Sequence, residues 1–512
     1  MLTSSLARPP VRSLATSLAT SLAGSMAGSL AARIPGPSAP AWVLAESLAS
    51  AMFSFGSLLL IGRVIGPAAA GLGGLPIASF LLLEIVAGAL FSNSLVQRTA
   101  LSHKHVGSAV VTSLALGLLC AVLLVVVTPL FGSAAEVPML RALSLALAPL
   151  LPMAAFAGTV SGLLLRERQF RMLSLRLLIG QPVALACGLA AARLGGGAWA
   201  MVAVQVVAVV ITFVLMLSSA RARVRFAFDL SALRDLLRIA LPSLLGTFVS
   251  CGKYRFFLIG LGAFVAPAVL ALSNFAFRFL DALLSLVFQG IGRIGVSNLC
   301  RLQHDRDALA EYYGELTRLL ALIGFALCAG VALVAPDLVC VLMGPAWAPS
   351  GRALVVAASV SSLSCLFGDY ASLFLAVGKP RLNLLLAIFS MGVSISALLA
   401  LRPHTPMQAA LAWSAEAAVL APVMTGLVLR ELDRPLRWLA MKILPAVIAT
   451  LAMILAVCLA QQIPFPDRVT RLISAVAVGA VTYGAVAWIA LGRTLPVAFT
   501  HAPAREASLE AV

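Results

Sequence analysis

Charged side chains inside long apolar runs are the residues of this sequence best placed to do chemistry. Arg278 and Asp281 lie in a run at about 265–290, and Lys253 and Arg255 lie in one at about 239–262. A charge at the centre of a membrane-spanning helix costs about 2.5–3.5 kcal/mol even on the insertion scale, so such residues usually pair with one another or line a substrate or ion pathway. All four are therefore candidate functional residues.

The spacing of these residues limits how they can be used. Arg278 and Asp281 are three positions apart and share one helix face, so either they neutralise each other, or Arg278 faces a water-filled cavity and Asp281 holds its guanidinium in place. Lys253 and Arg255 are two positions apart and point about 200° apart on a helix, so both cannot face one cavity squarely. One of them can snorkel toward the membrane interface.

Acidic residues inside apolar runs are candidates for proton coupling. Glu84, Asp369 and Glu416 lie in such runs, and Asp281 joins them. Each elementary charge moved down about 100 mV supplies about 2.3 kcal/mol, which is enough to bias a conformational equilibrium. Packing against a neighbouring arginine is an equal alternative for each acid.

The composition shows what kind of element must carry these charges. Of the 512 residues, 61% are hydrophobic and only 11% are charged, and the mean hydropathy is +1.05. Soluble domains carry about 25% charged residues. Apolar runs of about 20 residues recur without period-2 alternation, which favours helices over barrel strands. We predict an all-α, polytopic membrane protein with about 14 transmembrane helices between residues 41 and 491. The predicted spans include about 41–62, 72–92, 177–194, 239–262, 265–290 and 319–343, and a basic cytoplasmic loop that ends at Arg176 precedes the span at 177–194.

The distribution of basic residues predicts the orientation of these helices. The formal net charge is +17, and most of the 36 Lys and Arg residues lie in the N-terminal segment, in alternate loops and in the C-terminal segment. An excess of Lys and Arg marks cytoplasmic segments, so both termini are expected in the cytoplasm. This excess reflects topology, and we expect no nucleic-acid partner. The eight cysteines are scattered, and no metal site or cofactor is expected.

No sequence motif predicts catalysis. There is no phosphate-binding GxxxxGK[ST] loop and no HExxH, and the longest polar stretch, Gly292–Arg318, is too short for a catalytic domain. We expect a protein that is not an enzyme. Residues 1–40 contain repeated SLAT-like units and are predicted to be a disordered, low-complexity tail. Residues 492–512 are predicted to be a cytoplasmic tail.

Several motifs resemble one transporter family. Leu58–Gly71, LLLIGRVIGPAAAG, is similar to the ARxLGPxxFG signature of the polysaccharide-transport (oligosaccharide flippase) family in the multidrug/oligosaccharidyl-lipid/polysaccharide exporter superfamily. Ser297–Tyr313 resembles its SRLQxDxxRLxxxY segment, and Ala335–Ser350 its APxLVxLLxGxxW run. With GGGAWAMVAVQ and LFLAVGKPR, the resemblance covers about residues 42–430 in the family's order.

This resemblance implies a fold of two pseudo-symmetric six-helix lobes. The expected N-lobe is 41–238 (helices 1–6), the C-lobe is 239–430 (helices 7–12), and 431–491 holds two extra helices. An internal sequence repeat supports the two lobes. LLIG at Leu59–Gly62, followed by Gly66-Pro67, recurs as FLIG at Phe257–Gly260, followed by Ala266-Pro267. Substrate paths in transporters commonly lie between such repeats.

The resemblance also implies a function. We expect the protein to flip an undecaprenyl-linked oligosaccharide repeat unit across a bacterial inner membrane by alternating access, for lipopolysaccharide O-antigen, capsule or exopolysaccharide synthesis. Arg278, Lys253 and Arg255 would bind the phosphates. Arg63 and Arg98 would either guide the headgroup or anchor the membrane interface.

The expected partners are the lipid-linked oligosaccharide and membrane lipid, with a polysaccharide polymerase and glycosyltransferases as further candidates. The alternatives of similar shape are a cation-coupled drug or small-molecule antiporter and a peptidoglycan lipid-precursor flippase.

Overall fold

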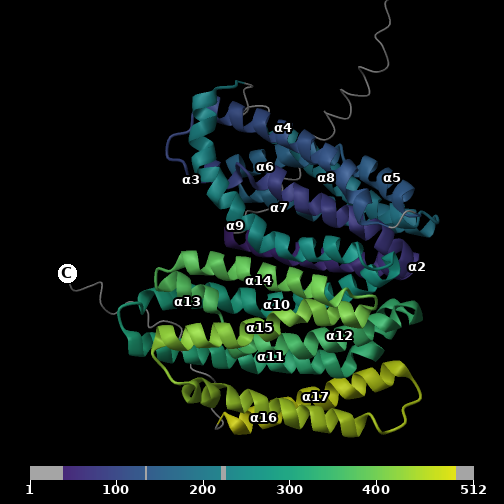
Figure 1. Cartoon of the computed structure of the whole chain (residues 1–512), viewed down its shortest axis with the longest axis vertical. Helices are drawn as coiled ribbons and strands as arrows, with labels where there is room; N and C mark the ends of the chain where they lie inside the picture. Colours follow the sequence, from purple (N-terminus) through teal and green to yellow (C-terminus); the bar gives the residue numbers. More distant parts are fainter. Residues whose placement is uncertain (1–38, 133–134, 221–226, 492–512) are drawn as a thin grey trace, which may run out of the picture.

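The computed structural model describes residues 39–132, 135–220 and 227–491, and this part of the chain is helical, without strands (Figure 1). Its longer helices are α2 (Ala39–Ala89), α4 (His103–Val127), α5 (Val137–Leu147), α6 (Leu150–Arg166), α7 (Phe170–Arg193), α8 (Ala198–Ala220), α9 (Leu230–Gly262), α10 (Pro267–Arg301), α11 (Arg306–Met343), α12 (Ala348–Ser361), α14 (Pro380–Leu401), α15 (Pro406–Leu432), α16 (Leu436–Ala460) and α17 (Arg468–Ala490). The short helices α3 (Ser92–Gln97) and α13 (Tyr370–Ala376) lie at turns.

The described helices include 12 that are long and apolar enough to cross a membrane, and a bent pair within α9 brings the number to 13. The prediction of an all-α polytopic membrane protein is confirmed. One of the 12 contains most of α2, which at 51 residues is about 75 Å long, more than twice the apolar thickness of a bilayer. Counting its two arms separately gives up to 14 crossings in the described residues, close to the predicted number.

The break in α2 occurs at Gly66. Its φ of 77° and ψ of 169° are outside the helical region, and a positive φ is readily adopted only by glycine. Pro67 follows, where its fixed φ suits the first turn of a new helix. The predicted spans at 41–62 and 72–92 are therefore the two arms of one interrupted helix, and the expected loop between them is reduced to this break.

The helices form two bundles joined by α2 and α9. Figure 1 shows α3 to α8 in one bundle and α10 to α17 in the other, with α2 and α9 between them. The first part of α9 packs through Leu233 and Leu236 on α3 and α4, whereas Phe257 in its second part belongs to the largest apolar core, shared with α10, α12 and α15. The two parts, Leu230–Val249 and Cys251–Gly262, are bent by 53°.

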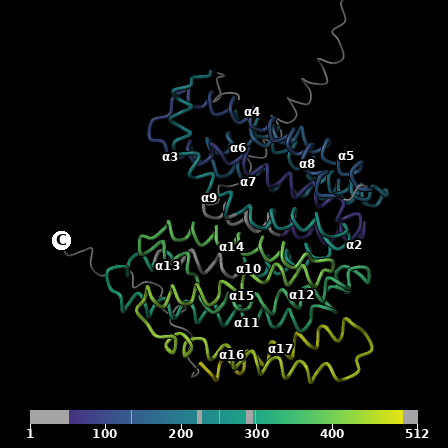
Figure 2. Tube along the Cα trace, in the orientation of Figure 1, coloured from purple at the N-terminus to yellow at the C-terminus, as the bar shows by residue number. Residues whose placement is uncertain are grey.

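The last two helices form a hairpin on the outside of α11, at the far end of the chain path in Figure 2. Lys442 of α16 pairs with Glu311 and Glu315 of α11, and Arg471 of α17 pairs with Asp337. Tyr483 donates a hydrogen bond to the Leu322 carbonyl. The hairpin therefore contacts the second bundle rather than the space between the bundles.

One end of the molecule joins the two bundles tightly. Arg63, near the end of the first arm of α2, donates to the carbonyls of Val341 and Leu342 at the end of α11, the latter at 3.0 Å. Gly62 lies against Met343 and Trp347, and Trp347 is fully buried. These contacts close the structure at this end.

Several predicted helix boundaries change, and the largest shift of a helix start is at α11, which starts at Arg306 where the sequence predicted a start at about 319. The helix expected to start at 177 starts at Phe170, and the one expected at 239 starts at Leu230, where Asp229 caps it by accepting from the Ser231 and Ala232 amides. Most of the predicted tail at 1–40 and all of the tail at 492–512 lie outside the described residues.

Candidate functional site

A cavity of about 740 Å³ lies between the two bundles, lined by α2, α3, α6, α7, α8, α9 and α10. Its charged lining residues are Arg176 on α7, Arg255 on α9, Arg278 on α10 and Glu84 on α2. The charges of these side chains sum to +2. Within the described residues, this cavity is electropositive and faced by helices from both bundles.

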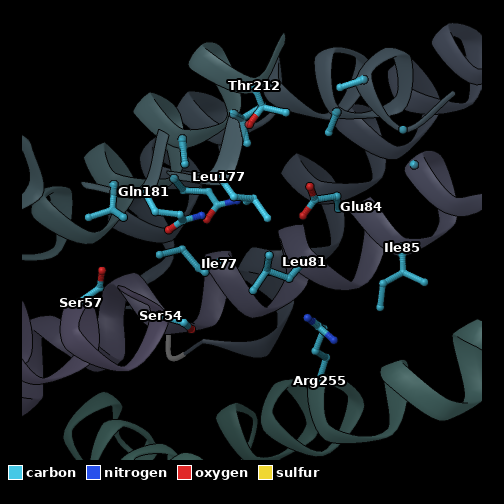
Figure 3. A pocket seen from close by; sticks show the side chains of 18 of the residues that line it. Ser54, Ser57, Ile77, Leu81, Glu84, Ile85, Leu177, Gln181, Thr212 and Arg255 are labelled. Carbon is cyan, nitrogen blue, oxygen red and sulfur yellow. The ribbon is translucent and has the colours of Figure 1, made fainter. Parts of the chain in front are cut away.

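The rest of the lining combines neutral polar groups with apolar surface. Figure 3 shows side chains from α2, α7, α8 and α9 arranged around the space. Hydroxyl and amide groups can exchange hydrogen bonds with an uncharged hydrated ligand such as a sugar. The neutral polar lining residues are Ser54, Ser57, Ser92, Asn93, Ser161, Gln181, Gln205, Thr212 and Thr247.

Arg278 lies on α10 and reaches across to α2. Its Nη2 donates to Ser54 Oγ at 2.6 Å. Asp281, three residues further on, is exposed and forms no ion pair with Arg278 in the described structure. The intrahelical pair considered from the sequence is therefore not what this structure shows, and Asp281 does not hold the Arg278 guanidinium.

Arg255 enters the cavity from α9. Its Nη1 donates to the Cys251 carbonyl one turn earlier, at 2.7 Å, and its buried Nε has no hydrogen-bond partner in the described part of the chain. Glu84, on α2, lies within electrostatic range of both Arg255 and Arg176. Figure 3 shows Glu84 and Arg255 around the same cavity. Arg255 therefore presents donors to the cavity, and no acid of the described residues forms an ion pair with it.

Arg176 is a cavity residue that sequence reasoning missed. Its Nη1 donates to Ser161 Oγ on α6 at 2.7 Å. The sequence placed Arg176 in a cytoplasmic loop, because the span after it was drawn as 177–194. That span has 18 residues, close to the shortest length that crosses a bilayer, and extending it toward the N-terminus would have included Arg176.

Lys253 and Glu416 lie outside the cavity lining and pair with each other. Lys253 Nζ is 2.7 Å from Glu416 Oε1 and 2.9 Å from Oε2. Asp369 also lies away from the cavity, where it caps α13 by accepting from the amide and hydroxyl of Ser372. Neither acid faces the cavity cations.

The two arginines expected at the helix ends also have protein partners. Arg63 binds the carbonyls at the end of α11, as described above. Arg98 Nη2 pairs with Asp235 of α9 at 3.2 Å, and its Nε donates to the Ala100 carbonyl. In this structure both arginines connect helices.

No group of three His, Cys, Asp or Glu side chains in the described ranges could hold a metal ion. The chemistry that the cavity can perform is recognition of an anion. Guanidinium groups form charge-assisted and bidentate hydrogen bonds with phosphate, and three of them here surround one space.

Comparison with known proteins identifies a matching family and a curated relative. A family model described as polysaccharide biosynthesis protein matches residues 40–352, more than half of the chain. A curated relative, the teichuronic acid biosynthesis protein TuaB of Bacillus subtilis (strain 168), is 23% identical over 157 residues, which are 31% of this chain and 32% of that protein. The alignment thus spans about a third of that relative's length.

Two solved structures are similar over most of their length. The lipid II flippase MurJ, in an inward closed conformation, has a TM-score of 0.73 at 12% identity and covers 88% of this chain and 98% of its own. An inward-facing multidrug resistance MATE family transporter of the MOP superfamily has a TM-score of 0.62 at 17% identity, covering 75% and 94%. At these identities the likeness shows the fold.

Proposed function

We propose, from the premise that this chain belongs to the polysaccharide biosynthesis protein family, that it flips a lipid-linked oligosaccharide across a membrane. The observation that carries this proposal is the cavity, in which Arg176, Arg255 and Arg278 face a space also lined by amides and hydroxyls. An undecaprenyl-linked repeat unit has an apolar chain, one or two phosphates and a hydrated glycan. The cavity offers partners for the last two.

The physical problem is to move the polar part of this substrate. Phosphate and glycan cannot cross about 30 Å of hydrocarbon unaided, since polar and charged groups lose their hydrogen bonds with water there. The lipid chain needs no such help, because it can remain in the bilayer. Guanidinium groups replace water around the phosphates, and the neutral polar lining replaces water around the sugars.

Alternating access follows from where the cavity lies. It is bounded by α2, α6, α7 and α8 of the proposed N-lobe (41–238) and by α9 and α10 of the proposed C-lobe (239–430). Arg63 and the end of α11 join the lobes at one end. Breaking these contacts and forming others at the opposite end would expose the cavity to the other side of the membrane.

The distribution of basic residues supports an inner-membrane orientation with both termini in the cytoplasm. In that orientation the end held by Arg63 faces outward and is closed here. We assign proton coupling to Glu84, since it is the acid among the charged lining residues of the cavity. No step of this mechanism forms or breaks a covalent bond, so the activity that we propose is transport.

Deleting the gene and labelling the lipid-linked glycan pool tests the proposal. Undecaprenyl-linked repeat units should accumulate on the cytoplasmic side, and surface polysaccharide should fall. Wild-type protein and Arg141→Ala, which changes an exposed arginine of α5 away from the cavity, should restore both. Arg278→Ala, expressed to the same level, should restore neither.

Other outcomes would favour other functions. Unchanged surface polysaccharide with altered resistance to cationic dyes would favour a drug antiporter, although a cavity with three arginines repels cations. Accumulation of peptidoglycan precursor with cell lysis would favour a peptidoglycan lipid-precursor flippase. Either result would contradict the assignment to polysaccharide synthesis.

A further inference from the structure

A second charged cluster lies in the second bundle, where α9 meets α14 and α15. Lys253 Nζ is held by both carboxylate oxygens of Glu416, at 2.7 and 2.9 Å, and donates to Ser390 Oγ at 3.2 Å. The Ser390 hydroxyl also donates to Glu416 Oε1, and the Ser394 hydroxyl donates to Oε2 at 2.9 Å. Each carboxylate oxygen is therefore bound by one hydroxyl and by the ammonium. We call these four side chains the Lys253 cage.

An aromatic ring completes the surroundings of the ammonium. The Trp413 ring centroid is 5.5 Å from Lys253 Nζ, within the range of a cation–π contact. Trp413 is itself held by Phe257, edge-on at 5.0 Å, and by Phe277, stacked at 5.5 Å. The ring is part of a packed apolar core and provides a fixed face toward the cation.

The cage is largely shielded from solvent. The side chains of Lys253 and Glu416 are 27% and 13% exposed, within helices of membrane-spanning length. Removing one partner of such a pair leaves an uncompensated charge and is strongly destabilising. Without a cation in the cage, the carboxylate of Glu416 would remain uncompensated or would have to take up a proton.

We propose that the cage is a monovalent-cation site whose permanent occupant is the Lys253 ammonium. Without Lys253, the site would consist of one carboxylate, two hydroxyls and an aromatic face, with a net charge of −1. Oxygen ligands of this kind suit hard cations, and a single carboxylate matches a single positive charge. The covalently attached ammonium occupies this position, so no dissolved ion is needed to hold α9 against α14 and α15.

The cage is separate from the cavity that binds substrate in the proposed function. Arg255, two residues along α9, faces the cavity, whereas Lys253 is not among the cavity lining residues. The inference therefore does not depend on what is transported, and its test measures stability rather than flipping.

The test measures the melting temperature of the purified full-length protein in sodium chloride, potassium chloride and choline chloride at equal ionic strength. The wild-type protein should melt at the same temperature in all three. Lys253→Ala should melt lowest in choline and rise by at least about 3 °C, in a saturable manner, with one of the alkali ions, since the free ion would occupy the vacated position. Lys253→Gln provides a second variant that retains a hydrogen-bond donor.

Two controls separate this effect from general salt effects. Lys379→Ala removes the lysine at the N-cap position of α14, which pairs with Glu431 of α15. This pair has no such cage in the described residues, so the variant should show no ion preference. The double variant Lys253→Ala with Glu416→Gln should also lose the ion preference, since it removes the carboxylate.

Three results would overturn the proposal. The first is saturable alkali-ion dependence in the wild-type protein. The second is the same ion preference in the double variant. The third is that neither Lys253→Ala nor Lys253→Gln shows an alkali-ion preference, whether they fold equally in all three salts or fail to fold in either alkali salt, because the cage would then be unable to accept a free cation.

Discussion

Gly71 and Pro267 touch across the two bundles so closely that a Cβ on Gly71 would lie 1.7 Å from the Pro267 carbonyl oxygen. Gly71 is in the second arm of α2, and Pro267 is the first residue of α10. The internal sequence repeat around Gly66-Pro67 and Ala266-Pro267 thus identifies two segments that meet in space. Only glycine at position 71 permits this approach.

Gly71→Ala should weaken the closed end of the molecule. A methyl group there overpacks the contact at a cost of about 1–3 kcal/mol, which the protein can avoid by separating α2 from α10. Spin labels on the exposed residues Ala68 and Ala263 would report this separation as a longer distance distribution. Gly74→Ala is the matched control, because a Cβ at Gly74 meets nothing within 4 Å. An unchanged distribution in Gly71→Ala would contradict the prediction.

Arg176→Ala should weaken binding of undecaprenyl diphosphate to the purified protein by about 10- to 150-fold. A hydrogen bond to a charged group is worth about 1.5–3 kcal/mol, and every 1.4 kcal/mol is tenfold in affinity. The affinity of Arg176→Lys should lie between those of the wild-type protein and Arg176→Ala, since lysine retains the charge without the planar guanidinium group. Arg193→Ala, at the exposed end of the same helix, should bind normally. Equal affinities for Arg176→Ala and Arg193→Ala would remove Arg176 from the proposed site.

Glu84→Gln should separate binding from energy coupling. Without the acid, the charged lining residues become three arginines alone, so undecaprenyl diphosphate should bind at least as tightly as to the wild-type protein. Flipping in proteoliposomes should no longer accelerate when a pH gradient is imposed. Glu167→Gln changes an exposed acid outside the cavity and should leave the gradient response intact. A normal response in Glu84→Gln would mean that coupling lies elsewhere, with Asp281 as the next candidate.

We predict that the stability of the protein depends on pH through Asp229, a residue outside the membrane-spanning segments. The Ser231 hydroxyl, the Lys104 ammonium and the amides of Ala232 and Ser231 bind its carboxylate and hold the pKa well below its usual range. A depressed pKa in the folded state gives stability that is present above the unfolded value, near pH 4, and is lost as the pH falls toward the folded value.

Asp229→Asn should therefore lower the melting temperature at pH 7, and the difference from the wild-type protein should shrink as the pH falls below about 4. Melting curves from about pH 7 down to about pH 2.5 would measure this, since the loss occurs below the unfolded-state pKa. Asp305→Asn is the control, because the Asp305 cap of α11 accepts from two backbone amides and, in the described structure, forms neither an ion pair nor a hydroxyl hydrogen bond like those of Asp229. A difference for Asp229→Asn that stays constant with pH would be inconsistent with the ionised carboxylate as its source.

The sequence was sufficient to predict the helical membrane fold, and three of the residues that it singled out, Glu84, Arg255 and Arg278, line the cavity. Apolar run length predicts spanning helices directly, and the spacing of Lys253 and Arg255 predicted that they face different directions. Arg255 lies in the cavity lining and Lys253 does not. The partner of Lys253 could not be predicted, because Glu416 is 163 residues away and only the packing of α9 on α15 brings them together.

The position of a helix boundary explains why the sequence did not predict Arg176 as a cavity residue. Arg176 was assigned to a loop because four arginines between 166 and 176 were read together as a basic connection. The helix starts at Phe170, and its first turns carry Arg176 into the space between the bundles. Local composition does not distinguish a charge before a span from a charge inside it when the neighbouring helices supply the polar surroundings.

The course of α9 has a mechanical consequence. Its first part is packed into one bundle and its second into the other, and Lys253 and Arg255 extend from the second part in different directions. A rotation of that segment about its own axis would displace both side chains together, so Arg255 could not withdraw from a bound phosphate without straining the attachment of Lys253 to Glu416. The stiffness of that attachment would then set how far the helix can turn during each transport cycle.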